Sequence, residues 1–188
     1  VEGLPVRIMD TRKTTPGLRL LEKYAVKVGG GENHRMSLGD GVLIKDNHLA
    51  ALHSCGLSMG EIVAKARQNA RLSLRGAEAA RRSRGRQRRS NLQVRQTQIE
   101  VEVKTVPEAV EAAEAGADII MLDNMSLEDM RKAVESIQGR ALIEASGGIT
   151  LDKVRAVAET GVDFISVGAL THSATALDIS LELEMSDE

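Results

Sequence analysis

The sequence predicts an α/β fold, specifically a parallel β/α barrel that is TIM-like but incomplete. The first observation behind this prediction is that, from residue 99 onward, short apolar segments alternate with Ala-rich or amphipathic segments. Alternation at this spacing is typical of parallel β/α units. The second is that polar and glycine residues follow the apolar segments, at the strand ends where β/α barrels place their binding sites.

In the second half of the chain we expect four strands and three helices. "IEVEV" predicts the first strand, with Glu100 and Glu102 on one face because side chains alternate in a strand. Gly116 stops the first helix, and Ser126 and Thr150 are candidate N-caps for the other two. The expected strands cover residues 99–103, 118–124, 140–148 and 162–170, and the expected helices cover 106–117, 126–139 and 150–161.

The first half is less regular but consistent with the same fold. An apolar run at 6–9 predicts a strand, 18–28 a helix, 29–35 a loop, 41–49 a strand with its exit, and 59–69 a helix. A single Phe, a single Tyr and no Trp leave an aliphatic core, which suits buried parallel strands.

An Arg-rich segment at 71–98 interrupts this pattern. It contains nine Arg and one acid, and it lacks aliphatic periodicity after Leu74. We interpret it as a solvated inserted loop or an anomalous segment within one β/α-barrel catalytic domain at 1–188. Nucleic-acid binding is the less favoured interpretation, because no aromatic side chain interleaves the Arg residues.

Composition excludes several classes of protein. The 188 residues suit one domain, and 25 basic against 27 acidic residues create no strong global field for nucleic acid or a membrane surface. The single cysteine, Cys55, excludes an internal disulfide, is expected to be a small buried side chain, and suits the cytoplasm. No apolar run approaches the length of a membrane span, and from the first residues given we expect no signal peptide.

The predicted strand ends collect side chains that suit a polyanionic substrate. Cations in such number can bind several carboxylates or phosphates, whereas Glu102 and Asp123 could share Mg²⁺ or hydrogen-bond sugar hydroxyls. Backbone N–H groups of the glycines late in the barrel suit a phosphate. The candidate residues are Arg12, Lys13, His34, Arg35, Lys45, Glu102, Asp123, Ser146, Gly147, Gly148 and Gly168.

The chain resembles the quinolinate phosphoribosyltransferase family, also named nicotinate-nucleotide pyrophosphorylase (carboxylating). The resemblance rests on "DTRKTTPGLR", "GGGENHR", "LIKDNH", "IEVEV", "MLDNM", "EASGGIT" and "VGALTHSATALDISL", which occur in the family's order. They extend from about residue 9 to 70 and from 99 to 183.

The resemblance implies a reaction and a role for each candidate. Quinolinate and phosphoribosyl pyrophosphate would give nicotinate mononucleotide, pyrophosphate and CO₂, with Mg²⁺ as cofactor, in NAD biosynthesis. Lys45, Glu102 and Asp123 would be catalytic, and the two acids would hold Mg²⁺ directly or through water. The carboxylates of quinolinate would bind Arg12, His34, Arg35 and Lys45, and Lys13 would bind phosphoribosyl pyrophosphate. The 5′-phosphate would bind Ser146, Gly147, Gly148 and Gly168, with His172 nearby.

The same resemblance implies what this chain lacks. Family members begin with a separate α/β domain that contributes a further Arg across a dimer interface, and we expect that domain to be absent from this chain. A homodimer or hexamer is the expected assembly of the full-length family. The alternatives are an inactive or incomplete barrel fragment and a related nicotinate phosphoribosyltransferase, the latter disfavoured because it would need fewer cations.

Overall fold

The computed structural model describes residues 1–83 and 97–182. Within them one parallel six-stranded sheet has the strand order β1-β6-β5-β4-β3-β2. The strands are β1 (Arg7–Met9), β2 (Val42–Ile44), β3 (Ile99–Val103), β4 (Ile119–Asp123), β5 (Leu142–Ser146) and β6 (Phe164–Ser166). The helices are α1 (Arg19–Val28), α2 (Asp46–Ser54), α3 (Met59–Ser83), α4 (Val106–Glu114), α5 (Leu127–Ile137), α6 (Val154–Ala158) and α7 (Ala169–His172).

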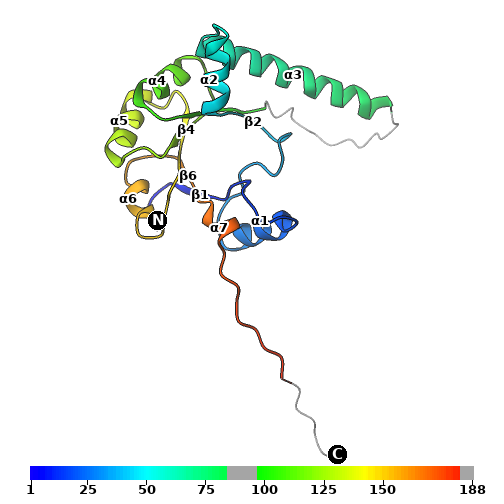
Figure 1. Ribbon diagram of the computed structural model, residues 1–188, viewed down its shortest axis with the longest axis vertical. Coiled ribbons are helices and arrows are strands. Elements are labelled where there is room, and N and C mark those ends of the chain that lie inside the picture. The colour runs from blue at the N-terminus through cyan, green and yellow to red at the C-terminus, as the bar shows by residue number, and fades with distance from the viewer. Residues whose placement is uncertain (84–96, 183–188) are drawn as a thin grey trace, which may run out of the picture.

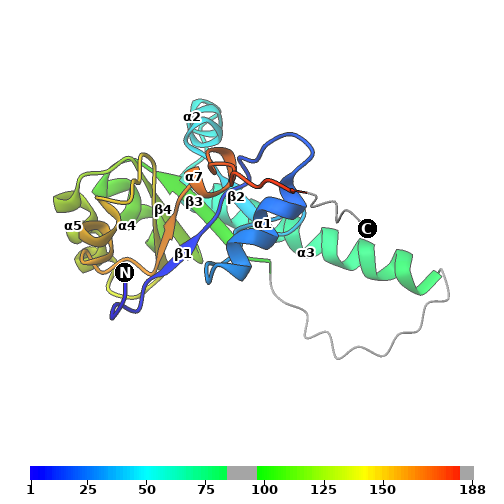
Figure 2. The same ribbon diagram turned by 90° about the horizontal axis from the view of Figure 1, so that it is seen from below.

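The sheet curves like a barrel wall but does not close. β1 and β2 are its two edges, and no pairing joins them among the described residues. Figures 1 and 2 show α4, α5 and α6 along the outside of the curved sheet, with the far end of α3 projecting away from it. The predicted α/β class and incomplete TIM-like barrel are therefore confirmed.

The strand β3 shows how the sequence positions the site. Ile99, Val101 and Val103 are buried on the helix-covered side of the sheet, where they join the aliphatic core. Glu100 and Glu102 alternate with them and are also buried, on the inner side of the barrel. The two-residue period therefore separates an apolar outer layer from a charged interior.

Two helix starts follow from local sequence. Ser126 accepts a hydrogen bond from the Asp129 N–H at 3.1 Å, which confirms it as the N-cap of α5. Thr150 is not the cap predicted for the next helix: α6 begins at Val154, and Lys153 occupies the N-cap position. The Thr150 carbonyl accepts from the N–H groups of Lys153 and Val154, so a turn precedes the helix.

Three other predictions about the first half need correction. The helix expected to end near residue 69 continues to Ser83, because residues 71–83 are rich in Arg, Ala and Leu, which favour helix. Their interpretation as a loop was wrong, and the rest of the Arg-rich segment lies outside the described residues. α2 was missed, and Cys55 is exposed because it directly follows the last turn of that surface helix. None of the described helices is both long and apolar enough to cross a membrane.

Candidate active site

The carboxyl ends of the strands surround a cavity of about 420 Å³. Parallel strands present these ends at one edge, so residues distant in sequence converge there. Eight of the predicted site residues line this cavity: Arg12, Lys13, His34, Arg35, Lys45, Glu102, Asp123 and Ser146.

The loop after β1 holds two of these cations by its backbone. Arg19 donates to the carbonyl oxygen of Arg12 at 3.2 Å, and Thr171 Oγ1 donates to that of Lys13 at 2.7 Å. The loop is thus fixed through main-chain atoms, while the side chains of Arg12 and Lys13 line the cavity. The buried Nε of Arg12 has no hydrogen-bond partner within the described part of the chain.

The Asp that opens the same loop has a structural role that sequence reasoning missed. Asp10 is fully buried and pairs with the ammonium of Lys23, which is 1% exposed. Its other oxygen accepts from Asn33 Nδ2 at 2.6 Å, and the His34 N–H donates to Asp10 Oδ1 at 2.9 Å. A buried ion pair with these additional hydrogen bonds locks β1, α1 and the loop that carries His34 together.

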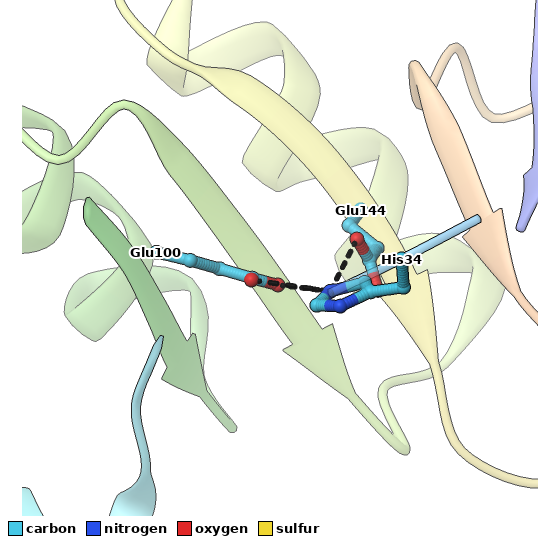
Figure 3. Close-up of side chains that lie close together, drawn as sticks. All are labelled: His34, Glu100 and Glu144. Carbon is cyan, nitrogen blue, oxygen red and sulfur yellow. Dashed lines mark hydrogen bonds and ion pairs between the residues drawn. The ribbon is translucent and has the colours of Figure 1, made fainter. Parts of the chain in front are cut away.

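His34 reaches inward between two acidic side chains of the sheet. Its Nε2 lies 3.2 Å from Glu100 on β3 and 3.6 Å from Glu144 on β5, as Figure 3 shows. The Arg35 N–H donates to Nδ1 at 2.8 Å, which assigns the imidazole proton to Nε2, facing the carboxylates.

Burial and neighbouring groups have opposite effects on the protonation of His34. Burial lowers its pKa, but the hydrogen bond and the charge of Glu100 outweigh burial and raise the pKa above 6.5. In the doubly protonated ring, Nδ1 would carry a hydrogen that points at the Arg35 N–H. Repulsion between these two N–H groups opposes the charged form of His34. We therefore take the neutral Nε2–H ring as the form at neutral pH.

Glu144 has the most perturbed carboxyl group of the site. Burial raises its pKa to about 7, repulsion from Glu100 acts in the same direction, and His34 and Arg35 act against it. The Ser166 hydroxyl on β6 also lowers the pKa, but neither carboxyl oxygen meets hydrogen-bond geometry with a residue that the structure describes. Burial also lowers the pKa of Arg35, whose Nη1 donates to the Gly41 carbonyl oxygen at 2.9 Å.

Glu102 and Asp123 form a second acidic group, nearer the cavity mouth. Lys45 Nζ lies 3.7 Å from Glu102 Oε2. Burial raises the pKa of Glu102, Lys45 counteracts this, and the charge of Asp123 raises it further. The two acids fit Mg²⁺, because it binds through one or two carboxylates plus water or phosphate oxygens, and a cation would relieve their mutual repulsion.

The glycines after β5 and β6 lie close to neighbouring side chains, and Gly147 also has a backbone conformation that favours glycine. Gly147 has φ +92°, and a Cβ there would lie 2.4 Å from the Asn124 side chain. A Cβ at Gly168 would lie 2.7 Å from His172 Nε2. These residues and Gly148 follow the strand ends, but they are not among those lining the 420 Å³ cavity.

Comparison with known proteins establishes the relationship. The family model described as "Quinolinate phosphoribosyl transferase, C-terminal domain" matches residues 1–80 and 77–182. The chain belongs to this family. The resemblance inferred from the motifs is therefore confirmed.

Individual members of the quinolinate phosphoribosyltransferase family match nearly the whole chain. A probable nicotinate-nucleotide pyrophosphorylase (carboxylating) of Bacillus subtilis is 45% identical, over 97% of this chain and 54% of the relative. The nicotinate-nucleotide pyrophosphorylase (carboxylating) of Rattus norvegicus is 41% identical, over 96% and 52%. The crystal structure of NadC from Streptococcus pyogenes superposes with a TM-score of 0.76 at 43% identity, covering 95% of this chain and 53% of that one. The chain thus spans about half the length of the relatives it matches.

The structure brings most of the predicted site residues together around one cavity, but four of them lie outside its lining. Gly147, Gly148, Gly168 and His172 adjoin the strand ends outside the cavity lining, and their role in binding phosphate stays a prediction. The ligand roles of the eight lining residues stay predictions too.

Sequence reasoning missed Glu144 and did not place Glu100 in the site. The available signal was the same for both: an acid at an inward position within an otherwise apolar strand. Asp10 and Lys23 gave a weaker signal, since the two partners of that pair are 13 positions apart in the sequence.

Proposed function

We propose that this chain is the barrel portion of an enzyme that transfers phosphoribose from phosphoribosyl pyrophosphate to quinolinate and removes one carboxylate. The products would be nicotinate mononucleotide, pyrophosphate and CO₂. Membership of the family supports the proposal, as do the names of the relatives. The observation that carries it is the convergence of five basic side chains on one cavity that is also lined by two carboxylates, Glu102 and Asp123.

The basic residues suit a dicarboxylate. Arg12 and Arg35 each bury an Nε that lacks a partner among the described residues, so guanidinium donors remain for a ligand. Arginine binds carboxylates bidentately, which would orient a planar pyridine as well as attract it. His34 and Lys45 line the same cavity and add further donors.

The acids suit the sugar. Departure of pyrophosphate leaves positive charge on the ribose, and preorganised carboxylates stabilise such charge in a low-dielectric site. Glu102 and Asp123 would hold Mg²⁺, which when bound would neutralise the charge of the pyrophosphate leaving group. The cations would also hold the pyridine nitrogen close to the sugar carbon that it attacks.

The family also suggests a further domain, an oligomeric state and a location for this protein. The part of the relatives' length that this chain does not match would correspond to an N-terminal domain, and a homodimer or hexamer would complete the site across a subunit interface. Cytoplasmic location agrees with a chain that has a single, unpaired cysteine.

The test is a turnover assay with quinolinate, phosphoribosyl pyrophosphate and Mg²⁺, reading pyrophosphate and labelled CO₂ separately. We would compare the 188-residue chain with the same chain joined to the N-terminal half of the Bacillus subtilis relative. Equal release of both products in either form supports the proposal. Turnover with nicotinate in place of quinolinate would support the nicotinate alternative, and ligand binding without turnover in both forms would support an inactive fragment.

A further inference from the structure

Glu144 occupies a position between two cavities. Its carboxyl is on the inner side of β5, and its side chain lines both the 420 Å³ cavity and a second cavity of about 290 Å³, called the deeper cavity below, which lies toward the amino ends of β2, β3 and β4. Glu100 lines only the deeper cavity, whereas His34 and Arg35 line both. Glu144 is therefore the acid at the floor of the proposed substrate site.

A carboxylate at this floor would oppose binding of a dianion, but a neutral carboxyl would not. The groups that face Glu144 are Glu100 from β3, and His34 and Arg35 from the loop after α1. Burial and the charge of Glu100 raise the pKa of this carboxyl to about 7, so a large fraction of it is protonated at neutral pH. Neither oxygen meets hydrogen-bond geometry with a described residue, although His34 Nε2 and the Ser166 hydroxyl lie beside the carboxyl, so a protonated Glu144 has no fixed acceptor for its proton.

The reaction proposed above needs such a proton. When the bond between the ring carbon and its carboxylate breaks, CO₂ leaves and the electron pair stays on the ring carbon. That carbon becomes a C–H only if a proton is delivered inside the cavity, away from bulk water. The basic side chains of the site bind carboxylates, but protonated cations that grip the substrate are poorly placed to give up their protons.

We propose that Glu144 is the catalytic acid that delivers this proton to the ring carbon. This inference rests on the proposed function. The new C–H bond takes the proton of the Glu144 carboxyl and the electron pair left by CO₂, and Glu144 is left as a carboxylate.

His34 and the deeper cavity complete the cycle. The Nε2–H of His34, 3.6 Å from Glu144 Oε2, stabilises the newly formed carboxylate. Reprotonation of Glu144 would then come from the side of the deeper cavity, which its side chain also lines, and not past the bound product. One proton from water is consumed in each turnover, and no oxidant or reductant is needed.

The experiment compares Glu144→Gln with the matched control Glu100→Gln. Both changes neutralise an acid beside His34, but Glu100 does not line the substrate cavity. Pyrophosphate, CO₂ and nicotinate mononucleotide would be followed in single turnovers, and the dicarboxylated mononucleotide would also be supplied directly to the 188-residue chain. Circular dichroism and quinolinate binding would verify the fold, and Glu144→Asp, which keeps an acid but shortens its reach, is a second variant.

We expect Glu144→Gln to release pyrophosphate within a few-fold of the unmodified rate while CO₂ and product formation fall about 100-fold or more, with the dicarboxylated mononucleotide accumulating. Glu144→Asp should fall between the two, and Glu100→Gln should not uncouple the steps. Equal loss of pyrophosphate and CO₂ in Glu144→Gln, or the same uncoupling in Glu100→Gln, would overturn the inference.

The directly supplied mononucleotide separates the two proposals. If the unmodified chain decarboxylates it but never transfers phosphoribose, the proposed function fails and the role of Glu144 is still measured by the variant. If the unmodified chain transfers phosphoribose and Glu144→Gln decarboxylates normally, only the role of Glu144 fails. An unmodified chain that decarboxylates no mononucleotide in either assay overturns the inference as well.

Discussion

Replacing Glu144 by Gln should make the protein more stable at alkaline pH, although it alters a fully buried side chain of the core. The amide is nearly isosteric with a protonated carboxyl, so packing changes little. The difference lies in charge. The carboxyl must ionise at high pH within a buried site beside Glu100, whereas the amide has no charge to bury.

The magnitude follows from linkage. The pKa of Glu144 is raised from 4.5 to about 7 by burial, so the folded state holds its proton more tightly than the unfolded state. A group with a raised folded-state pKa contributes stability below its unfolded pKa and loses it as pH rises through the folded pKa. From pH 4.5 to above 7, the unmodified protein should therefore lose about 3 kcal/mol of unfolding free energy that Glu144→Gln keeps.

The assay is urea unfolding at a series of pH values between 4.5 and 8.5. His34 contributes a loss in the same direction, because its pKa is also raised, so the informative quantity is the difference between the unmodified protein and Glu144→Gln. That difference should grow with pH in favour of the variant. Parallel curves would refute the placement of an ionisable, destabilised carboxyl at this position.

Four further outcomes follow from the same structure. Asp10→Ala leaves the ammonium of Lys23 buried without its partner and should cost about 3–5 kcal/mol of unfolding free energy, measured by urea unfolding; an Asp10→Asn protein as stable as the unmodified one would show that the charge is unimportant there. Gly147→Ala forces a Cβ to within 2.4 Å of the Asn124 side chain at φ +92°, and a lowered Tm should follow; an unchanged Tm would contradict the close packing. Arg35→Ala should weaken quinolinate binding by about 1.5–3 kcal/mol, a roughly ten- to hundred-fold rise in KM, while an unchanged KM removes it from the carboxylate site. Thr105→Ala removes the N-cap of α4 and should cost about 1 kcal/mol, with Thr105→Ser as the control that keeps the cap.

The sequence was most informative where a strict period or a local signal applies. The strand β3 illustrates this, since alternation alone places Glu100 and Glu102 on one face and the apolar residues on the other. Parallel strand ends then predict that cations from separate loops meet, and the cavity contains them. Ser126 was predicted as a cap for the same reason, because capping depends on only a few neighbouring residues.

Features that depend on tertiary distance were not accessible in the same way. The pairing of Asp10 with Lys23, and the approach of Glu144 to His34, depend on how β1, α1 and β5 pack. No local period signals such contacts. The extent of α3 was missed for another reason: a run of Arg was interpreted through its charge, although Arg, Ala and Leu also favour helix.

The buried Asp10 prevents the loop that carries His34 from moving independently of the surrounding structure. The His34 N–H donates to Asp10, and the Lys23 ammonium donates to both Asp10 and the His34 carbonyl oxygen. Movement of this loop by itself is unfavourable, because it would leave the buried Asp10 carboxylate without some of its hydrogen-bond partners. The His34 amide should consequently exchange its hydrogen with solvent as slowly as the central strands do, so that the segment carrying a ligand-facing side chain belongs to the last part of the molecule to unfold.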